Sequence, residues 1–310
     1  MSEGGFMKDN SGVLTTVLVE DSGKSEVNSK KRELCALISP VVFWMVVFVA
    51  IPLLLVVGVS FLQRGIYGGI EYQVTINNYI RMFNPMYFRI IWNSVVLSFF
   101  TTIICLILGY PFAYFTARAP QKIRGMLLML TILPYWTNSL VRTYAWIILL
   151  RTEGVINTIL LNIGVITAPI PMLYNESAVL IGLVYVLFPF MVLPLYTSIE
   201  KLDRSLLEAA SDLGATPLKA FFKVTLPLTK SGILAGAVMV FIPSLGYFFI
   251  PDLMGGSKGL LISNLIKNQF LTARDWPFGS AISIILIAIT LIIIFLYFRN
   301  AGSKEKLEVF

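Results

Sequence analysis

Residues 90–115 read IIWNSVVLSFFTTIICLILGYPFAYF, and this stretch decides the fold class. It contains no Asp, Glu, Lys or Arg, so none of its side chains carries a charge that needs water. A helix rises about 1.5 Å per residue, so this stretch is long enough to cross the apolar core of a bilayer, which is roughly 30 Å thick. Lipid offers the backbone no hydrogen-bond partner, whereas a helix satisfies its backbone groups internally. The stretch therefore predicts a transmembrane helix.

The composition of the whole chain also indicates a membrane protein. Of its 310 residues, 57% are hydrophobic and 13% are charged, which is fewer ionisable groups than the surface of a soluble domain needs. Five further stretches are long and apolar enough to span a bilayer. They are residues 38–62, 126–150, 177–199, 232–250 and 278–298. We therefore expect an all-α membrane protein with six transmembrane helices.

The polar residues argue against an enzyme, a metal site and a nucleic-acid-binding protein. The chain has no histidine, and the apolar stretches contain no metal-ligand cluster, no nucleophile with a neighbouring base and no acidic pair. Cys35 and Cys105 lie at or within apolar runs and are expected to pack as small hydrophobic side chains. The net charge of +7 comes from Lys and Arg in short segments, whereas nucleic-acid binding needs a clustered basic face. We expect a non-catalytic chain that holds no cofactor or metal and binds no nucleic acid.

The distribution of Lys and Arg predicts the orientation in the membrane. Sixteen of these residues lie in segments 1–37, 117–125, 200–231 and 299–310, and eight lie in the alternate loops. Because loops rich in Lys and Arg stay on the cytoplasmic side, both termini and the 200–231 loop are expected in the cytoplasm. The predicted domains are a flexible cytoplasmic tail over 1–37, a six-helix transmembrane domain over 38–298 and a cytoplasmic C-terminal tail over 299–310.

Two stretches in the outer loops have helical apolar spacing but are too short to span. The first runs from Val155 to Ile163 and the second from Leu261 to Phe270. Apolar side chains recur every three to four residues in both. We expect two short helices on the outer face of the bundle.

The longest inner loop, 200–231, carries the signals of two short helices. Ser205-Leu206-Leu207-Glu208 has the sequence of a capping box, in which the serine and the glutamate each bond a backbone amide of the other. The helix that follows runs through Ala209 and Ala210. Gly214 is placed to end it in a left-handed conformation.

A second helix is predicted directly after this glycine. Thr216-Pro217 has the pattern of an N-cap followed by proline at the first helical position, and the helix continues through 219–223. Leu226-Pro227 is expected to end it and to lead into the next transmembrane helix. Two capped helices joined by a glycine predict a rigid projection on the cytoplasmic side.

These residues resemble the EAA loop of binding-protein-dependent ABC importer permeases. The match consists of Glu208-Ala209-Ala210, Gly214 and Leu226-Pro227, with Val224 at a position where isoleucine is frequent. The resemblance implies a six-helix type I ABC importer permease whose loop forms a cytoplasmic coupling helix and docks into a groove of an ATPase subunit. The coupling residues would then be Glu208, Ala209, Ala210, Gly214, Leu226 and Pro227. The alternative is that Glu208 only caps its helix and the leucines only pack.

The energy source is expected to lie in another chain. The sequence has no G-x-x-x-x-G-K-[ST] phosphate-binding loop. ATP and Mg²⁺ would therefore be bound by the partner ATPase subunit, and this chain would be the permease.

Four longer stretches resemble the spermidine/putrescine permeases of the PotB type. They are LPYWTNSL at 133–140, SIEKLD at 198–203, DLMGG at 252–256 and RDWPFG at 274–279. The resemblance implies a polyamine importer in the bacterial inner membrane. It also implies three partners, which are a PotA-like ATPase dimer, a PotC-like second permease and a PotD-like external binding protein.

The residues near two outer span ends suit a cationic, partly aliphatic cargo. Ammonium groups need carboxylates or aromatic faces, because an unpaired charge in hydrocarbon is costly. Asp252 follows an aromatic run that begins at Tyr247, and it is predicted to contact an ammonium group transiently. Trp136, Tyr144 and Tyr247 are predicted to form an aromatic wall, and Asn138 offers a polar group in the same region.

Two other interpretations of these residues stay open. Arg142 is the only basic residue well inside a predicted span, so Asp252 or Glu153 could serve only to neutralise it. Aromatic side chains in membrane helices also pack or anchor without touching cargo.

Two other functions are also considered. The coupling loop suits ABC permeases for iron, sulfate or a sugar equally well. A proton- or sodium-driven carrier is less favoured, because such carriers place ionisable groups at mid-membrane, and the first, second, fourth and sixth spans have none in their interiors.

Overall fold

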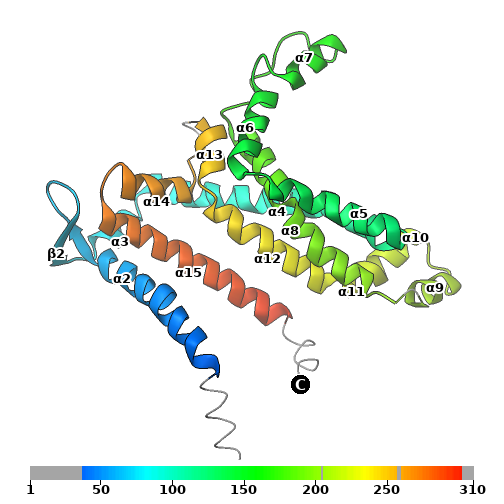
Figure 1. Ribbon diagram of the computed structural model, residues 1–310, viewed down its shortest axis with the longest axis horizontal. Coiled ribbons are helices and arrows are strands. Elements are labelled where there is room, and N and C mark those ends of the chain that lie inside the picture. Colours follow the sequence, from blue (N-terminus) through cyan, green and yellow to red (C-terminus); the bar gives the residue numbers. More distant parts are fainter. Residues whose placement is uncertain (1–36, 204, 257–259, 302–310) are drawn as a thin grey trace, which may run out of the picture. The chain divides into compact units, whose positions relative to one another are not determined.

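A computed structural model describes residues 37–203, 205–256 and 260–301 of the chain (Figure 1). The chain divides into two units, Met1–Gly58 and Val59–Phe310, and each is described by itself. Most of both predicted tails, and with the first tail Cys35, lies outside the described residues.

The described part of the first unit is an apolar helix, and it confirms the first predicted span. It belongs to the candidate membrane span Leu37–Ser60. The helix contains a wide π turn, η1 (Val46–Ala50), and continues as α2 (Ile51–Ser60). The π turn lies directly before Pro52, whose ring would crowd the carbonyl oxygen four residues back in a regular helix. The wider turn lets the helix continue through the proline.

In the described part of the second unit, the regular structure is helical apart from one two-stranded antiparallel sheet, β1 (Leu62–Arg64) and β2 (Ile70–Val74). The hairpin was not predicted from the sequence, so the all-α expectation is incomplete at this point. The helical elements are α3 (Asn77–Arg81), α4 (Pro85–Arg118), α5 (Gln121–Ile132), η2 (Leu133–Trp136), α6 (Ser139–Leu150), α7 (Val155–Asn162), α8 (Glu176–Glu200), α9 (Ser205–Asp212), α10 (Pro217–Ala220), η3 (Phe221–Thr225), α11 (Leu226–Leu228), α12 (Lys230–Gly246), α13 (Phe249–Met254), α14 (Ile262–Leu271) and α15 (Trp276–Ala301).

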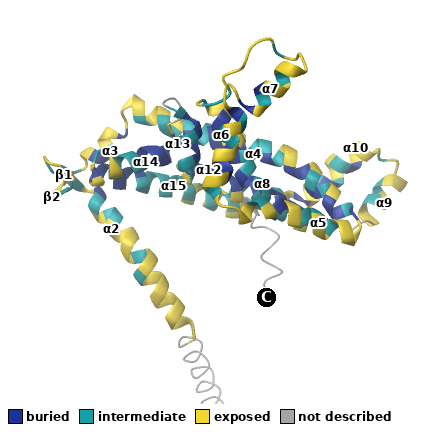
Figure 2. Cartoon of the chain, turned by 45° about the horizontal axis from the view of Figure 1, so that its top comes forward, coloured by how far each residue is buried: buried dark blue, intermediate teal, exposed yellow. Residues whose placement is uncertain are grey.

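Three of these helices, α4, α8 and α12, pack side by side and form the centre of the second unit (Figures 1 and 2). Small residues bring their backbones close together. A Cβ on Gly232 of α12 would clash with the Cβ of Ser198 and would lie 2.8 Å from the carbonyl oxygen of Pro194, both on α8. Gly236 approaches Met191 in the same way. Close approach at glycine is a common way for membrane helices to associate, because lipid supplies no hydrophobic drive between them.

The second, fourth and sixth predicted spans are confirmed as α4, α8 and α15. Among the described residues, five helices are long and apolar enough to cross a membrane, or six if one bent pair counts as a span. The two stretches with helical apolar spacing are helices as predicted, α7 and α14. Helix α7, however, falls within the candidate membrane span Ser139–Asn162, although it was expected to be too short to span.

The predicted third span, 126–150, is not one continuous helix. It divides into α5, the short 3₁₀ helix η2 and α6. Pro134 lies at the start of η2 and cannot donate a helical hydrogen bond. Asn138 then starts α6 as its N-cap, accepting a hydrogen bond from the Leu140 amide at 2.8 Å.

The predicted fifth span, 232–250, is also wrong at its end. Helix α12 stops at Gly246, Tyr247 is extended, and α13 begins at Phe249. The carbonyl oxygens at this break have partners on α14, because Ser263 Oγ donates to the oxygen of Tyr247 at 2.7 Å and Asn264 Nδ2 donates to that of Phe248 at 2.8 Å. The tertiary contact therefore satisfies the groups that the broken helix leaves open.

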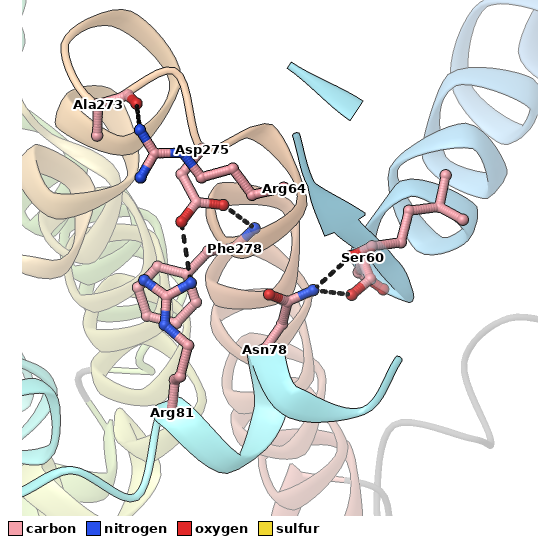
Figure 3. Close-up of polar contacts among 8 residues, drawn as sticks. Ser60, Arg64, Asn78, Arg81, Ala273, Asp275 and Phe278 are labelled. Carbon is pink, nitrogen blue, oxygen red and sulfur yellow. Dashed lines mark hydrogen bonds and ion pairs between the residues drawn. The ribbon is translucent and has the colours of Figure 1, made fainter. Parts of the chain in front are cut away.

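The hairpin and α3 are held against the turn between α14 and α15, as Figure 3 shows. Arg81 Nη1 lies 2.9 Å from Asp275 Oδ2, and the Arg81 guanidinium lies over the ring of Phe278 at 4.0 Å. The other carboxylate oxygen of Asp275 accepts from the Phe278 amide in the first turn of α15. Arg64 donates to the carbonyl oxygen of Ala273 at 2.8 Å. We call Arg64, Arg81, Asp275 and Phe278 the outer cluster.

Candidate functional site: an inner helix pair and the broken spans

The first amide of helix α9 is bound by an aspartate side chain that precedes the helix, so the predicted capping box is wrong. Ser205 is the first residue of α9 and donates its amide to Asp203 Oδ1 at 2.9 Å. The Ser205 amide and hydroxyl together hold the pKa of the Asp203 carboxyl below its ordinary value. The stabilisation from this carboxylate is therefore present at neutral pH, and it is lost as the pH falls through the lowered pKa.

The left-handed end of α9 is confirmed. Gly214 has a φ of +76°, and its amide donates to the carbonyl oxygen of Ser211 at 2.9 Å. The Ala215 amide donates to the oxygen of Ala210 at 2.9 Å. These two bonds form a Schellman motif, which needs the αL conformation that glycine adopts without strain.

The second predicted helix is present but longer than expected. Thr216 Oγ1 accepts from the Lys219 amide, and Pro217 is the first residue of α10. The helix does not end at Leu226-Pro227, because the π turn η3 precedes Pro227 and α11 continues to Leu228. As at Pro52, the wide turn relieves the clash that a proline ring causes in a regular helix. The break comes at Thr229, where Pro217–Leu228 and Lys230–Gly246 meet at 65°.

We call residues 205–228 the inner helix pair, and most of it is exposed (Figure 2). Its exposed side chains include four large apolar ones, Leu206, Leu213, Leu218 and Phe222. Helix α9 contains no buried residue. Leu213 is 89% exposed and Leu218 is 72% exposed, and Glu208 and Ala209 also face outward. Neighbouring apolar groups that a chain leaves uncovered are typical of a protein contact surface.

The base of the inner helix pair is fixed to the central helices. Tyr110 of α4 hydrogen-bonds through its hydroxyl to Thr229 Oγ1 at 2.9 Å, and its ring packs edge-on against Phe221. Thr229 Oγ1 donates in turn to the carbonyl oxygen of Thr225 at 2.9 Å. These contacts join the pair to α4 and to the start of α12.

Asp252 and Lys267 form an ion pair on the α13–α14 side. Lys267 Nζ lies 2.6 Å from Asp252 Oδ2, and Asn264 Nδ2 lies 3.4 Å from the other carboxylate oxygen. Both charged side chains keep partial contact with solvent. Among the described residues, Arg142 forms no ion pair with Asp252 or Glu153, which argues against the alternative that either acid serves to neutralise it.

Arg142 contacts an aromatic side chain. Its guanidinium lies 5.1 Å from the ring centroid of Tyr135. Tyr247 lies at the break after α12, and its ring packs edge-on against Phe249. Of the other predicted pathway residues, Trp136 is 77% exposed and Tyr144 is also exposed, whereas Asn138 is the N-cap of α6.

Three residues at these sites were not predicted from the sequence, namely Asp203, Lys267 and Tyr110, which anchors the pair. Asp203 lies two residues before Ser205, the spacing at which an aspartate forms an Asx turn with the following amide. Lys267 occupies one of the polar positions between the apolar residues of the predicted helix over 261–270, so the sequence already showed a charged group on that element. Tyr110 gave no local signal, because its partners are more than a hundred residues away.

A family model described as "Binding-protein-dependent transport system inner membrane component" matches residues 109–301, more than half of the chain. The chain belongs to this family. It is therefore an inner-membrane component of a binding-protein-dependent transport system, and the exposed inner helix pair lies within the matched region.

Named relatives extend the likeness to almost the whole chain. The chain is 49% identical over 284 residues to the "Spermidine/putrescine transport system permease protein PotB" of Haemophilus influenzae, covering 91% of this chain and 99% of the relative. It is 49% identical over 270 residues to the protein of the same name from Escherichia coli, covering 87% and 98%.

A solved structure supports the fold of this family member. A chain of a bacterial alginate ABC transporter, solved with its alginate-bound periplasmic protein, matches with a TM-score of 0.73. The match covers 91% of this chain and 98% of the other, at 18% sequence identity. The fold is therefore that of an ABC importer permease.

Proposed function

We propose that this chain is the permease subunit of an ATP-driven importer and forms half of the translocation pathway for polyamines such as spermidine and putrescine. The observation that carries the proposal is the 49% identity to the PotB proteins over nearly their whole length. Both termini and the inner helix pair lie in the cytoplasm in this proposal, because the inner segments hold sixteen of the 24 Lys and Arg residues.

The partners follow from the chemistry that this chain lacks and from its exposed surface. The sequence contains no phosphate-binding loop, so a PotA-like ATPase dimer binds ATP and Mg²⁺. The exposed leucines of the inner helix pair dock into that ATPase, with Glu208, Ala209 and Ala210 on the docking helix. A PotC-like second permease completes the pathway, and a PotD-like external binding protein delivers the cargo.

The coupling step uses the rigid connection from the inner helix pair to the core. When the ATPase closes, it moves α9–α11 as a body, since both ends of α9 are capped and the base is fixed by Tyr110 and Thr229. The movement passes to α12 across the bend at Thr229. Leu226 and Pro227 lie in this bend region rather than at the docking surface.

The cargo site is proposed to include Asp252, with Tyr247, Trp136 and Tyr144 as aromatic neighbours. Lys267 already supplies an ammonium group to Asp252 at 2.6 Å. A polyamine carries the same chemical group, so it can replace Lys267 without leaving the carboxylate unpaired. The partial solvent contact of both side chains leaves room for this exchange.

The test uses the complete complex in proteoliposomes, with ATP inside and the loaded binding protein outside. We expect ATP-dependent uptake of labelled spermidine or putrescine. Asp252→Asn should lower uptake by about tenfold or more, because the ammonium loses its carboxylate partner inside the membrane. ATPase stimulation should persist. Glu153→Gln, which neutralises an outer acid with no ion pair in the described part of the chain, is the matched control and should transport normally.

The outcomes separate a cargo site from a structural ion pair. If Asp252→Asn and Lys267→Met reduce assembly equally, Asp252 is a structural residue and the cargo site is wrong. If the wild-type complex transports neither polyamine but does transport another solute, the proposed substrate class is wrong.

A further inference from the structure

Arg142 of α6 lines a cavity, and neither the packing of the helices nor the proposed cargo site gives this buried arginine a partner. The cavity has a volume of about 300 Å³, and Arg142 is the only charged residue among the described residues that line it. Only 9% of the Arg142 surface is exposed. The lining residues are Phe112, Leu127, Leu130, Thr131, Pro134, Arg142, Val184, Tyr185, Phe188 and Pro189.

The guanidinium lacks a counter-charge within the described part of the chain. Its Nε is buried without a hydrogen-bond partner, and so is Ser139 Oγ one turn earlier. The three ion pairs there are Arg81–Asp275, Arg124–Glu200 and Lys267–Asp252, and none includes Arg142. An arginine does not lose its proton in a protein, so it cannot escape the cost of burial by becoming neutral. It needs an anionic group or water.

The position of the cavity argues against a lipid phosphate. Phe188 lies twelve residues from each end of α8 (Glu176–Glu200). At about 1.5 Å per residue, it is about 18 Å from either end of this membrane-spanning helix. The headgroup region lies near the ends of such a helix, so Arg142 faces its middle.

The surface beside the cavity resembles a protein interface. Trp136, Leu140, Val141 and Tyr144 are exposed on η2 and α6. Trp and Tyr that face lipid are usually found near the headgroups, whereas aromatic residues are common in protein interfaces. The backbone is also broken between η2 and α6, and broken backbone at membrane depth requires a covering of protein or water.

We propose that a carboxylate side chain of the companion permease enters this cavity and pairs with Arg142. The inference rests on the proposed function, in which two permease subunits form the pathway. The planar guanidinium then gains a fork-shaped contact to the carboxylate, and the companion covers the aromatic surface around it.

One substitution, Arg142→Met, should have opposite effects on the isolated chain and on the complex. In the purified chain alone, Arg142→Met should leave the midpoint of thermal unfolding unchanged or raise it, because it removes an unpaired buried charge. In the complex, the same change should lower the amount of companion permease that co-purifies by about tenfold or more, because it leaves the companion's carboxylate buried without a partner. Arg142→Lys should lower the amount of co-purified companion permease by less, because the lysine keeps the positive charge. Arg151→Gln, at an exposed arginine nine residues further on, is the matched control and should change neither measurement.

A charge exchange identifies the partner. Arg142→Glu should prevent co-purification, and one Asp/Glu→Arg change among the companion's membrane segments should restore it. Co-purification of Arg142→Met at the wild-type level would mean that the cavity holds only water and would overturn the proposal. So would a failure of every exchange. Nanodiscs with and without anionic phospholipid supply the last arm: an association that needs anionic lipid in wild type, and not in Arg142→Met, would assign the site to a lipid phosphate instead. None of these measurements uses polyamine uptake, so they test the Arg142 contact even if the proposed substrate class is wrong.

Discussion

At the residue scale, Gly214 and Gly125 show that the backbone conformation decides whether replacing a glycine by alanine destabilises the fold. Neither glycine has another heavy atom within 4 Å of the position of an added Cβ, so space is equal at both. Gly214 has a φ of +76° at the end of α9, whereas Gly125 lies inside α5. The two sites therefore differ in torsion angle.

The substitution Gly214→Ala should destabilise the inner helix pair. A non-glycine residue in the left-handed region costs about 1–2 kcal/mol, and the Schellman bonds of Gly214 and Ala215 depend on that conformation. Gly125→Ala should be neutral or stabilising by up to about 1 kcal/mol, since alanine favours a helix interior. ATPase activity and uptake of the reconstituted complex check the prediction. Gly214→Ala should hydrolyse ATP with reduced uptake per ATP, and equal coupling in both variants would contradict the role of the rigid pair.

At the element scale, prolines decide where helices widen, bend or stop. Pro52 and Pro227 each follow a π turn, and the helix passes through both. Pro134 lies in the 3₁₀ helix η2, which separates α5 from α6. The helix is interrupted at Pro134 because Asn138, four residues later, acts as the N-cap of a new helix. Glycines decide instead how closely α8 and α12 approach.

Gly232→Ala should weaken the packing of α12 on α8. The added Cβ would lie 2.8 Å from the backbone oxygen of Pro194, which cannot move aside as a flexible side chain would. Overpacking of this kind costs about 1–3 kcal/mol. Gly246→Ala on the same helix has open space and is the matched control. Thermal unfolding of the purified chain, followed by tryptophan fluorescence, should show a lower midpoint for Gly232→Ala only. Equal midpoints would show that the two backbones are further apart than described.

At the scale of the whole second unit, the outer cluster joins segments that lie far apart in the sequence. Arg81 and Asp275 are separated by 194 residues, yet they form an ion pair in which Asp275 is almost fully buried and the Arg81 side chain is 43% exposed (Figure 3). Asp275 also caps α15. The two partners therefore respond differently to the loss of the other.

Arg81→Met should destabilise the second unit more than Asp275→Asn does. Removing the arginine leaves a buried carboxylate without a counter-charge, at a cost of about 3 kcal/mol. The asparagine still accepts a hydrogen bond from the Phe278 amide, and the half-exposed Arg81 can be hydrated, so this change should cost about 1 kcal/mol. Chemical denaturation of the purified chain and proteolysis at the Gly65–Gly69 turn measure the difference. The reverse order would mean that Arg81, rather than Asp275, is the buried partner.

The amino-acid sequence by itself determined the features that depend on local composition and spacing. Apolar length predicted the spans that became α4, α8 and α15, and apolar periodicity predicted α7 and α14. Gly214 and Thr216-Pro217 predicted helix ends correctly, because caps depend on residues within a few positions of one another.

Only the tertiary structure decided the features that depend on partners distant in the sequence. It decided where the fifth predicted span ends, because α14 satisfies the carbonyl groups of Tyr247 and Phe248 at that break. It paired Asp252 with Lys267 and left Arg142 without a counter-charge in the described part of the chain. Charge and hydrogen-bond pairing are set by which side chains meet in space, and a residue's own type and neighbours do not contain that information. The physical reason is that a buried polar group takes the partner that folding brings within about 3 Å, whatever its distance along the chain.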